Sequence, residues 1–121
     1  MITVLVIDRD PTVRLTVKRV LERAGFAAFT AADMSAALRP LGSLKMDLVI
    51  CQIDMLGAGA EDAIAELVTD PAVRILALSD KDDTIPAASH GAVARLGKPF
   101  TESELLGVVR RSLARPPGRL V

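Results

Sequence analysis

The sequence predicts an α/β domain built on a parallel β-sheet with helices on both faces. Five short apolar runs are expected to be strands, and segments of helical period alternate with them. The third run (DLVICQI, 47–53) is apolar with no polar alternation, as suits a strand covered on both faces. Alternating strands and helices require crossover connections, which make neighbouring strands parallel. The length of 121 residues leaves room for one domain.

The first half of the chain begins with a β-branched apolar strand over residues 2–7. Asp10 followed by Pro11 is typical of an N-cap residue and the first helical position, and Gly25 is expected to stop this helix near Ala24.

A second strand is expected over residues 26–31. Asp33 can then cap a short helix, which we expect to end near Pro40, because proline lacks the backbone N–H that continues a helix.

The second half continues the alternation. The remaining strands are expected over 48–53, 74–79 and 92–96, and helices over 60–68 and 84–90. The run 92–96 is the least apolar and is expected at an edge of the sheet. Thr101 and Glu104 form a capping box that opens a last helix reaching about Ala114. The domain is therefore expected over residues 1–114, with a disordered tail over 115–121 that contains two prolines.

Composition excludes several classes of function. The 15 basic and 15 acidic residues cancel, so bulk charge offers no argument for binding to nucleic acid or acidic lipid. The single cysteine excludes an internal disulfide and fits a reducing compartment. No apolar stretch approaches the roughly 20 residues that span a bilayer, and the N-terminus lacks the basic region of a signal peptide. We therefore expect a cytoplasmic protein with no direct contact with nucleic acid or membrane.

Polar side chains gather where the expected strands end. The first, third, fourth and fifth strands are followed or closed by Asp8, Gln52, Ser79 and Lys98. Ligands of open parallel sheets bind at the carboxyl ends of the strands, so these four side chains form a candidate site.

Three motifs carry a resemblance to a known family. They are Val6-Ile7-Asp8 with Asp10-Pro11, Leu78-Ser79, and Gly91-Ala92 leading to Leu96-Gly97-Lys98-Pro99-Phe100. In this order they resemble the receiver domain (CheY-like) of two-component response regulators. The resemblance implies a flavodoxin-like (βα)5 doubly wound sheet of strand order 2-1-3-4-5, a cis peptide bond before Pro99, and a role in signalling rather than catalysis.

The resemblance also implies a phosphorylation site. The family phosphorylates an aspartate after the third strand, with help from an acidic pair that binds Mg²⁺, a Ser or Thr, and a Lys. Asp8, Ser79 and Lys98 match this pattern. Arg9 stands in place of the second acid, Gln52 in place of the acceptor, and Arg95 in place of the aromatic switch residue.

These departures change the chemistry of the site. Asp8, Arg9, Gln52 and Lys98 sum to a formal charge of +1, which repels Mg²⁺. A glutamine amide is no nucleophile toward phosphorus, because its nitrogen lone pair is delocalised. We therefore expect no cofactor, weak or absent Mg²⁺ binding, and no standard phosphorylation.

Several roles stay open for single residues. Asp8 is expected to pair with Lys98 or Arg9, and Arg9 to act as a tethered cation in the metal position or as a solvated loop residue. Gln52 either hydrogen-bonds to Lys98 or Ser79 or fills space.

Three further residues carry expectations of their own. Arg95 is expected not to turn inward without a paired acid, which breaks the coupling of site to surface. Cys51 is expected in the core and His90 at the surface.

Two principal hypotheses follow. In the first, the domain binds a signalling partner, or a second copy of itself, without phosphorylation, through the face of the fourth helix, fifth strand and fifth helix. In the second, it is a Mg²⁺-dependent phosphoacceptor that uses Asp54 or Asp8. A weaker third reading is a small-anion or nucleotide sensor at the same strand ends.

Overall fold

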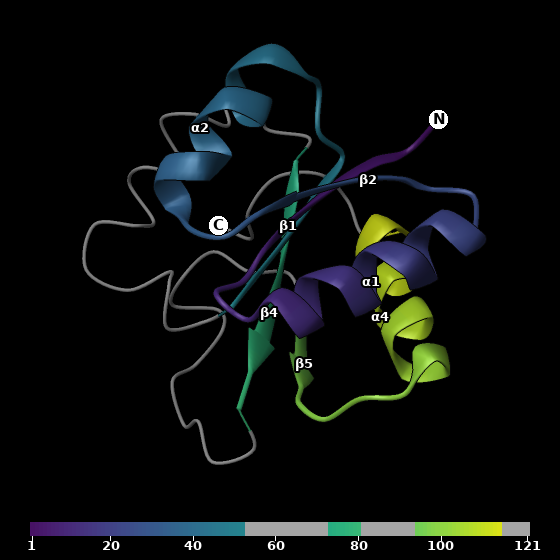
Figure 1. Cartoon of the computed structure of the whole chain (residues 1–121). Coiled ribbons are helices and arrows are strands. Elements are labelled where there is room, and N and C mark those ends of the chain that lie inside the picture. Colours follow the sequence, from purple (N-terminus) through teal and green to yellow (C-terminus); the bar gives the residue numbers. More distant parts are fainter. Residues whose placement is uncertain (53–72, 81–93, 115–121) are drawn as a thin grey trace, which may run out of the picture.

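The computed structural model describes residues 1–52, 73–80 and 94–114. Five strands form one sheet in the order β2-β1-β3-β4-β5, with every neighbouring pair parallel (Figure 1). They are β1 (Thr3–Ile7), β2 (Ala27–Ala31), β3 (Leu48–Gln52), β4 (Arg74–Ser79) and β5 (Ala94–Gly97). The strand order that the sequence implied is confirmed.

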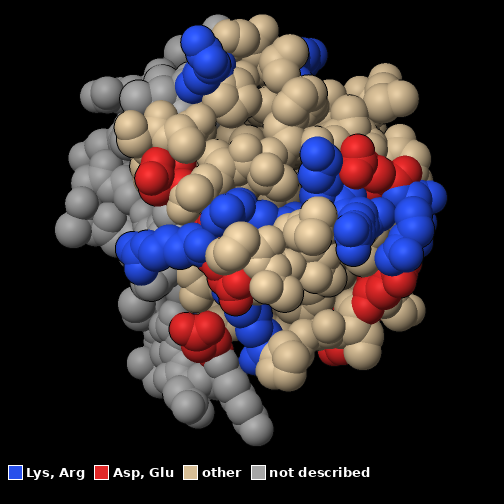
Figure 2. All heavy atoms as spheres, in the orientation of Figure 1, with Lys and Arg blue, Asp and Glu red and all other residues tan. Residues whose placement is uncertain are grey.

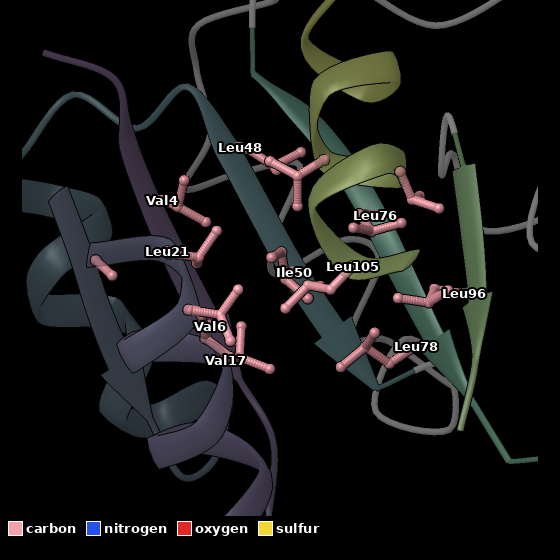
Figure 3. Packing of buried hydrophobic residues seen from close by; sticks show 14 residues of the cluster. Val4, Val6, Val17, Leu21, Leu48, Ile50, Leu76, Leu78, Leu96 and Leu105 are labelled. Carbon is pink, nitrogen blue, oxygen red and sulfur yellow. The ribbon is translucent and has the colours of Figure 1, made fainter. Parts of the chain in front are cut away.

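Three described helices cover the sheet, namely α1 (Pro11–Arg23), α2 (Met34–Ser43) and α4 (Glu102–Ala114). Helices α1 and α4 pack on one face, where Leu21 and Leu105 are fully buried within a cluster that includes Val6 and Ile50 (Figure 3). On the other face, Ala37 of α2 belongs to a second cluster. The expected helices over 60–68 and 84–90 and the tail over 115–121 lie outside the described residues.

The ends of the helices follow the expected local chemistry. Asp10 accepts a hydrogen bond from the Thr12 amide at 2.9 Å, and Asp33 accepts one from the Ala36 amide at 2.8 Å. The capping box is present in both directions, since the Thr101 amide donates to Glu104 and the Glu104 amide donates back to the Thr101 hydroxyl. These N-terminal predictions are confirmed.

The prediction that the second helix ends near Pro40 is wrong, because α2 continues to Ser43. Proline removes only its own N–H from the helical ladder. Its carbonyl remains an acceptor, and the Leu44 amide donates to it at 2.9 Å. The helix therefore extends one turn beyond the proline.

Three strand boundaries differ from expectation by one residue. Strand β1 begins at Thr3 and β2 at Ala27, one residue later than expected in each case. Strand β5 extends to Gly97 because this residue still pairs with Ser79 of β4. As expected, β5 lies at an edge of the sheet.

No helix in the described ranges is both long enough and apolar enough to cross a membrane.

Candidate functional site

The register of the sheet brings the predicted site residues to one edge. Ile7 pairs with Cys51, so Asp8 and Gln52 come next on two adjacent strands. Ser79 closes β4 opposite Gly97, and Lys98 follows directly. Asp8, Gln52 and Ser79 are only 2%, 7% and 3% exposed, so these three residues are largely shielded from solvent.

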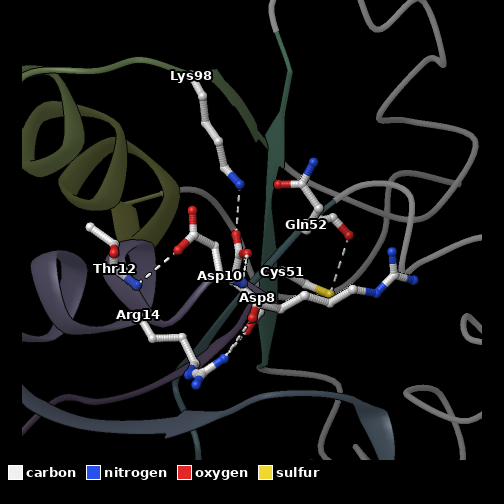
Figure 4. A network of polar contacts seen from close by, with 8 residues as sticks. Asp8, Asp10, Thr12, Arg14, Cys51, Gln52 and Lys98 are labelled. Carbon is white, nitrogen blue, oxygen red and sulfur yellow. Dashed lines mark hydrogen bonds and ion pairs between the residues drawn. The ribbon is translucent and has the colours of Figure 1, made fainter.

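Asp8 and Lys98 form the central ion pair of the site. The Lys98 Nζ lies 2.7 Å from Asp8 Oδ2, and the two side chains are 19% and 3% exposed (Figure 4). The other oxygen, Asp8 Oδ1, accepts a hydrogen bond from the Asp10 amide at 2.9 Å. The Lys98–Pro99 bond is cis, as the resemblance implied. The predicted Asp8–Lys98 pairing is confirmed, and both carboxylate oxygens of Asp8 are engaged.

Gln52 ends β3 without making the expected hydrogen bonds. Its Oε1 is buried and accepts no hydrogen bond from the described part of the chain. Lys98 turns to Asp8 instead, because a carboxylate is a stronger acceptor for an ammonium than an amide oxygen. Of the two roles left open for Gln52, hydrogen bonding to Lys98 or Ser79 is therefore absent, and filling space remains. Cys51 is fully buried, as expected.

The loop between β1 and α1 is held by an arginine that the sequence reasoning missed. Arg14 Nη1 donates to the backbone oxygens of Asp8 at 2.7 Å and Arg9 at 3.1 Å (Figure 4). Arg9 itself is exposed. A positive charge near the N-terminus of a helix is unfavourable, because the helix dipole is positive there. Arg14 at that position was therefore a sequence signal for a contact with the loop before the helix.

Arg95 contacts Ser79 at the site, and the expectation that it does not turn inward without a paired acid stays a prediction. Its Nε donates to the Ser79 hydroxyl at 3.0 Å, and the side chain is half-buried. The guanidinium thus meets the neutral Ser79 hydroxyl through its Nε.

A model of the response regulator receiver domain matches residues 4–110, which is most of the chain. The chain belongs to the response regulator receiver domain family. Receiver domains are in general signalling domains without enzymatic activity, and this one is a module of signal transduction.

Named relatives of this receiver domain include longer regulators. It is 33% identical over 115 residues to the DNA-binding response regulator MtrA of Mycolicibacterium smegmatis, covering 93% of this chain and 50% of that protein. It is 30% identical over 121 residues to the DNA-binding transcriptional regulator NtrC of Rhizobium meliloti, covering 97% of this chain and 25% of that protein. The chain thus spans a quarter to a half of these relatives.

Among solved structures, this receiver domain resembles the chemotaxis response regulator CheY4 of Vibrio cholerae. The TM-score is 0.77 at 27% identity, with 93% of this chain and 98% of that chain covered. It also resembles NtrX of Brucella abortus, with a TM-score of 0.82 at 27% identity, over 93% of this chain and 26% of that chain.

The described residues of this receiver domain do not suit the Mg²⁺ that the family implies. No group of three or more metal-binding side chains occurs within residues 1–52, 73–80 and 94–114. Asp8 already binds Lys98 and the Asp10 amide, and Gln52 offers a neutral oxygen. Asp54 and His90, singled out in the sequence, lie outside the described residues.

Proposed function

We propose that this receiver domain regulates a signalling partner by binding, without phosphorylation of an aspartate at the end of β3. The observation that carries the proposal concerns the acceptor position and the metal-binding acid, the two groups that phosphorylation would need. Gln52 occupies the end of β3 with a neutral amide, and Asp8 is locked to Lys98 at 2.7 Å.

The ion pair argues against metal binding. Mg²⁺ requires hard oxygen ligands in near-octahedral geometry and gives up its own water reluctantly. To recruit Asp8, the ion would have to displace the Lys98 ammonium and then lie next to it. A half-buried ammonium close to a divalent cation is unfavourable in a site of reduced dielectric constant.

The same contacts argue against Asp8 as a substitute phosphoacceptor. Asp8 is 2% exposed, and each of its carboxylate oxygens accepts a hydrogen bond. Attack on a phosphodonor needs a free lone pair aligned with the phosphorus atom. Because Asp8 is buried, the lone pairs that its two partners leave open have little access to a phosphodonor.

The partner is a signalling protein or a second copy of this chain. We place its binding at the face formed by the helix expected over residues 84–90 together with β5 and α4. Figure 2 shows basic and acidic side chains mixed on the visible face rather than segregated by sign. Such a surface supports protein recognition better than binding to a polyanion such as nucleic acid.

The proposal is tested by treating the chain with acetyl phosphate and Mg²⁺ and measuring its intact mass. The wild type is expected to gain no phosphoryl group, and its amide NMR spectrum is expected not to change with Mg²⁺ or beryllofluoride. The matched positive control is Arg9→Asp/Gln52→Asp, which restores the second acid and the acceptor and is expected to gain one phosphoryl group.

A phosphorylated wild type would refute the proposal. Repeating the reaction with Asp54→Asn and, separately, with Asp8→Asn would then identify which carboxylate accepts the group.

A further inference from the structure

Strand β5 and the residue that follows it bring two cationic side chains, Arg95 and Lys98, to the site. Lys98 binds Asp8, and Arg95 Nε donates to the Ser79 hydroxyl at 3.0 Å. A third contact is made by the backbone, where the Lys98 amide donates to the Ser79 carbonyl at 2.7 Å. Ser79 is therefore held to β5 through both its side chain and its main chain.

The register explains how Arg95 reaches Ser79. Arg95 pairs with Ala77, which lies two residues before Ser79 on β4. Side chains two apart on a strand point to the same side of the sheet, so Arg95 and Ser79 share a face. The long arginine stem spans the one intervening residue pair and brings its Nε to the hydroxyl.

The contact sets the orientation of a buried hydroxyl. Ser79 is 3% exposed, and the bond from Arg95 is the only hydrogen bond that its hydroxyl makes with the described residues. A hydroxyl that accepts a hydrogen bond must direct its own hydrogen elsewhere. A donor that carries a positive charge makes this bond stronger than one between neutral groups.

We propose that Arg95 is a positioning residue that latches Ser79 to β5, so that the site and β5 are joined permanently by a side-chain contact. The inference rests on the proposed function, because it names what holds the site in one state when no phosphoryl group arrives. A partner that binds the face containing β5 then always binds the same conformation of β5. That conformation is maintained by the hydrogen bond between Arg95 and Ser79.

Four variants test the latch in the absence of metal and phosphodonor. Ser79→Ala removes the acceptor, and Arg95→Lys keeps the charge but replaces the guanidinium. The double variant measures the coupling between them, and Ser79→Thr keeps the hydroxyl as a rescue. Arg110→Lys, at an exposed arginine of α4, is the matched control.

The first readout is amide hydrogen exchange at Leu96 and Lys98. The net contribution of one hydrogen bond corresponds to about a two- to tenfold change in an equilibrium constant. Each single variant is expected to speed exchange by about that factor, and the double variant by no more than the larger single effect. Ser79→Thr and Arg110→Lys are expected to exchange like the wild type.

The second readout is the NMR signal of the Arg95 Nε–H, which a general loss of packing would not move selectively. It is expected to be protected from solvent in the wild type and in Ser79→Thr, and exposed in Ser79→Ala. Additive exchange effects, or an Nε–H signal indifferent to Ser79→Ala, would overturn the latch. Phosphorylation of the wild type would refute the proposed function and leave these results unchanged, so the two failures can be told apart.

Discussion

Replacement of Lys98 by methionine probes the ion pair that occupies the centre of the site. The variant keeps an unbranched side chain of similar length and removes the ammonium that lies 2.7 Å from Asp8 Oδ2. The Asp8 side chain, which is 3% exposed, then keeps only the hydrogen bond from the Asp10 amide.

The expected loss of stability is about 3 kcal/mol. Deleting one partner of a fully buried ion pair costs roughly 3–5 kcal/mol, because a desolvated charge is left without compensation. The Lys98 side chain is 19% exposed, so water can reach part of the vacated space, which favours the lower end of the range. The double variant Asp8→Asn/Lys98→Met leaves no buried charge, and we expect it to recover about 2 kcal/mol of the loss.

Urea unfolding at neutral pH measures these differences. With a slope of about 2 kcal/mol/M, the midpoint of Lys98→Met is expected to fall by about 1.5 M. Lys45→Met, at an exposed lysine, is the control and is expected to stay within about 0.5 kcal/mol of the wild type. If Lys98→Met costs less than about 1 kcal/mol, or if Asp8→Asn is equally costly with and without Lys98, then the pair does not hold the site as argued.

Three further predictions use the same unfolding assay. Leu105→Ala, at a fully buried position of α4, is expected to lower the free energy of unfolding by about 3 kcal/mol through lost burial and a residual cavity, and a loss under 1 kcal/mol would contradict the packing described. Gly25→Ala is expected to cost about 1 kcal/mol, because Gly25 has φ of +93° with nothing within 4 Å of an added Cβ, so backbone strain alone acts; a stabilised variant would refute this. Arg14→Met is expected to cost about 2 kcal/mol, because the carbonyls of Asp8 and Arg9 lose a charged donor, and unchanged amide shifts at Asp8 to Asp10 would contradict that role.

Local sequence patterns predicted the secondary structure that depends on neighbouring residues. The caps at Asp10, Asp33 and Thr101 were predictable because each side chain bonds an amide two or three residues away. The end of the second helix was not, because Pro40 forbids one hydrogen bond but does not forbid a further turn.

The sequence by itself determined which groups meet at the site. Apolar runs define the strands, the strands are parallel, and parallel strands bring Asp8, Ser79 and Lys98 to one edge. The loss of the acceptor at Gln52 can likewise be read directly from the residue type.

Only the tertiary structure decided how those groups pair. Asp8 and Lys98 are ninety positions apart, and Lys98 could equally have reached Gln52 by strand order alone. The choice depends on burial and on donor–acceptor distances that arise when five strands pack together. Arg95 is the clearest case, because residue type gave only the condition that its charge needs a partner, whereas the register placed its Nε 3.0 Å from the Ser79 hydroxyl.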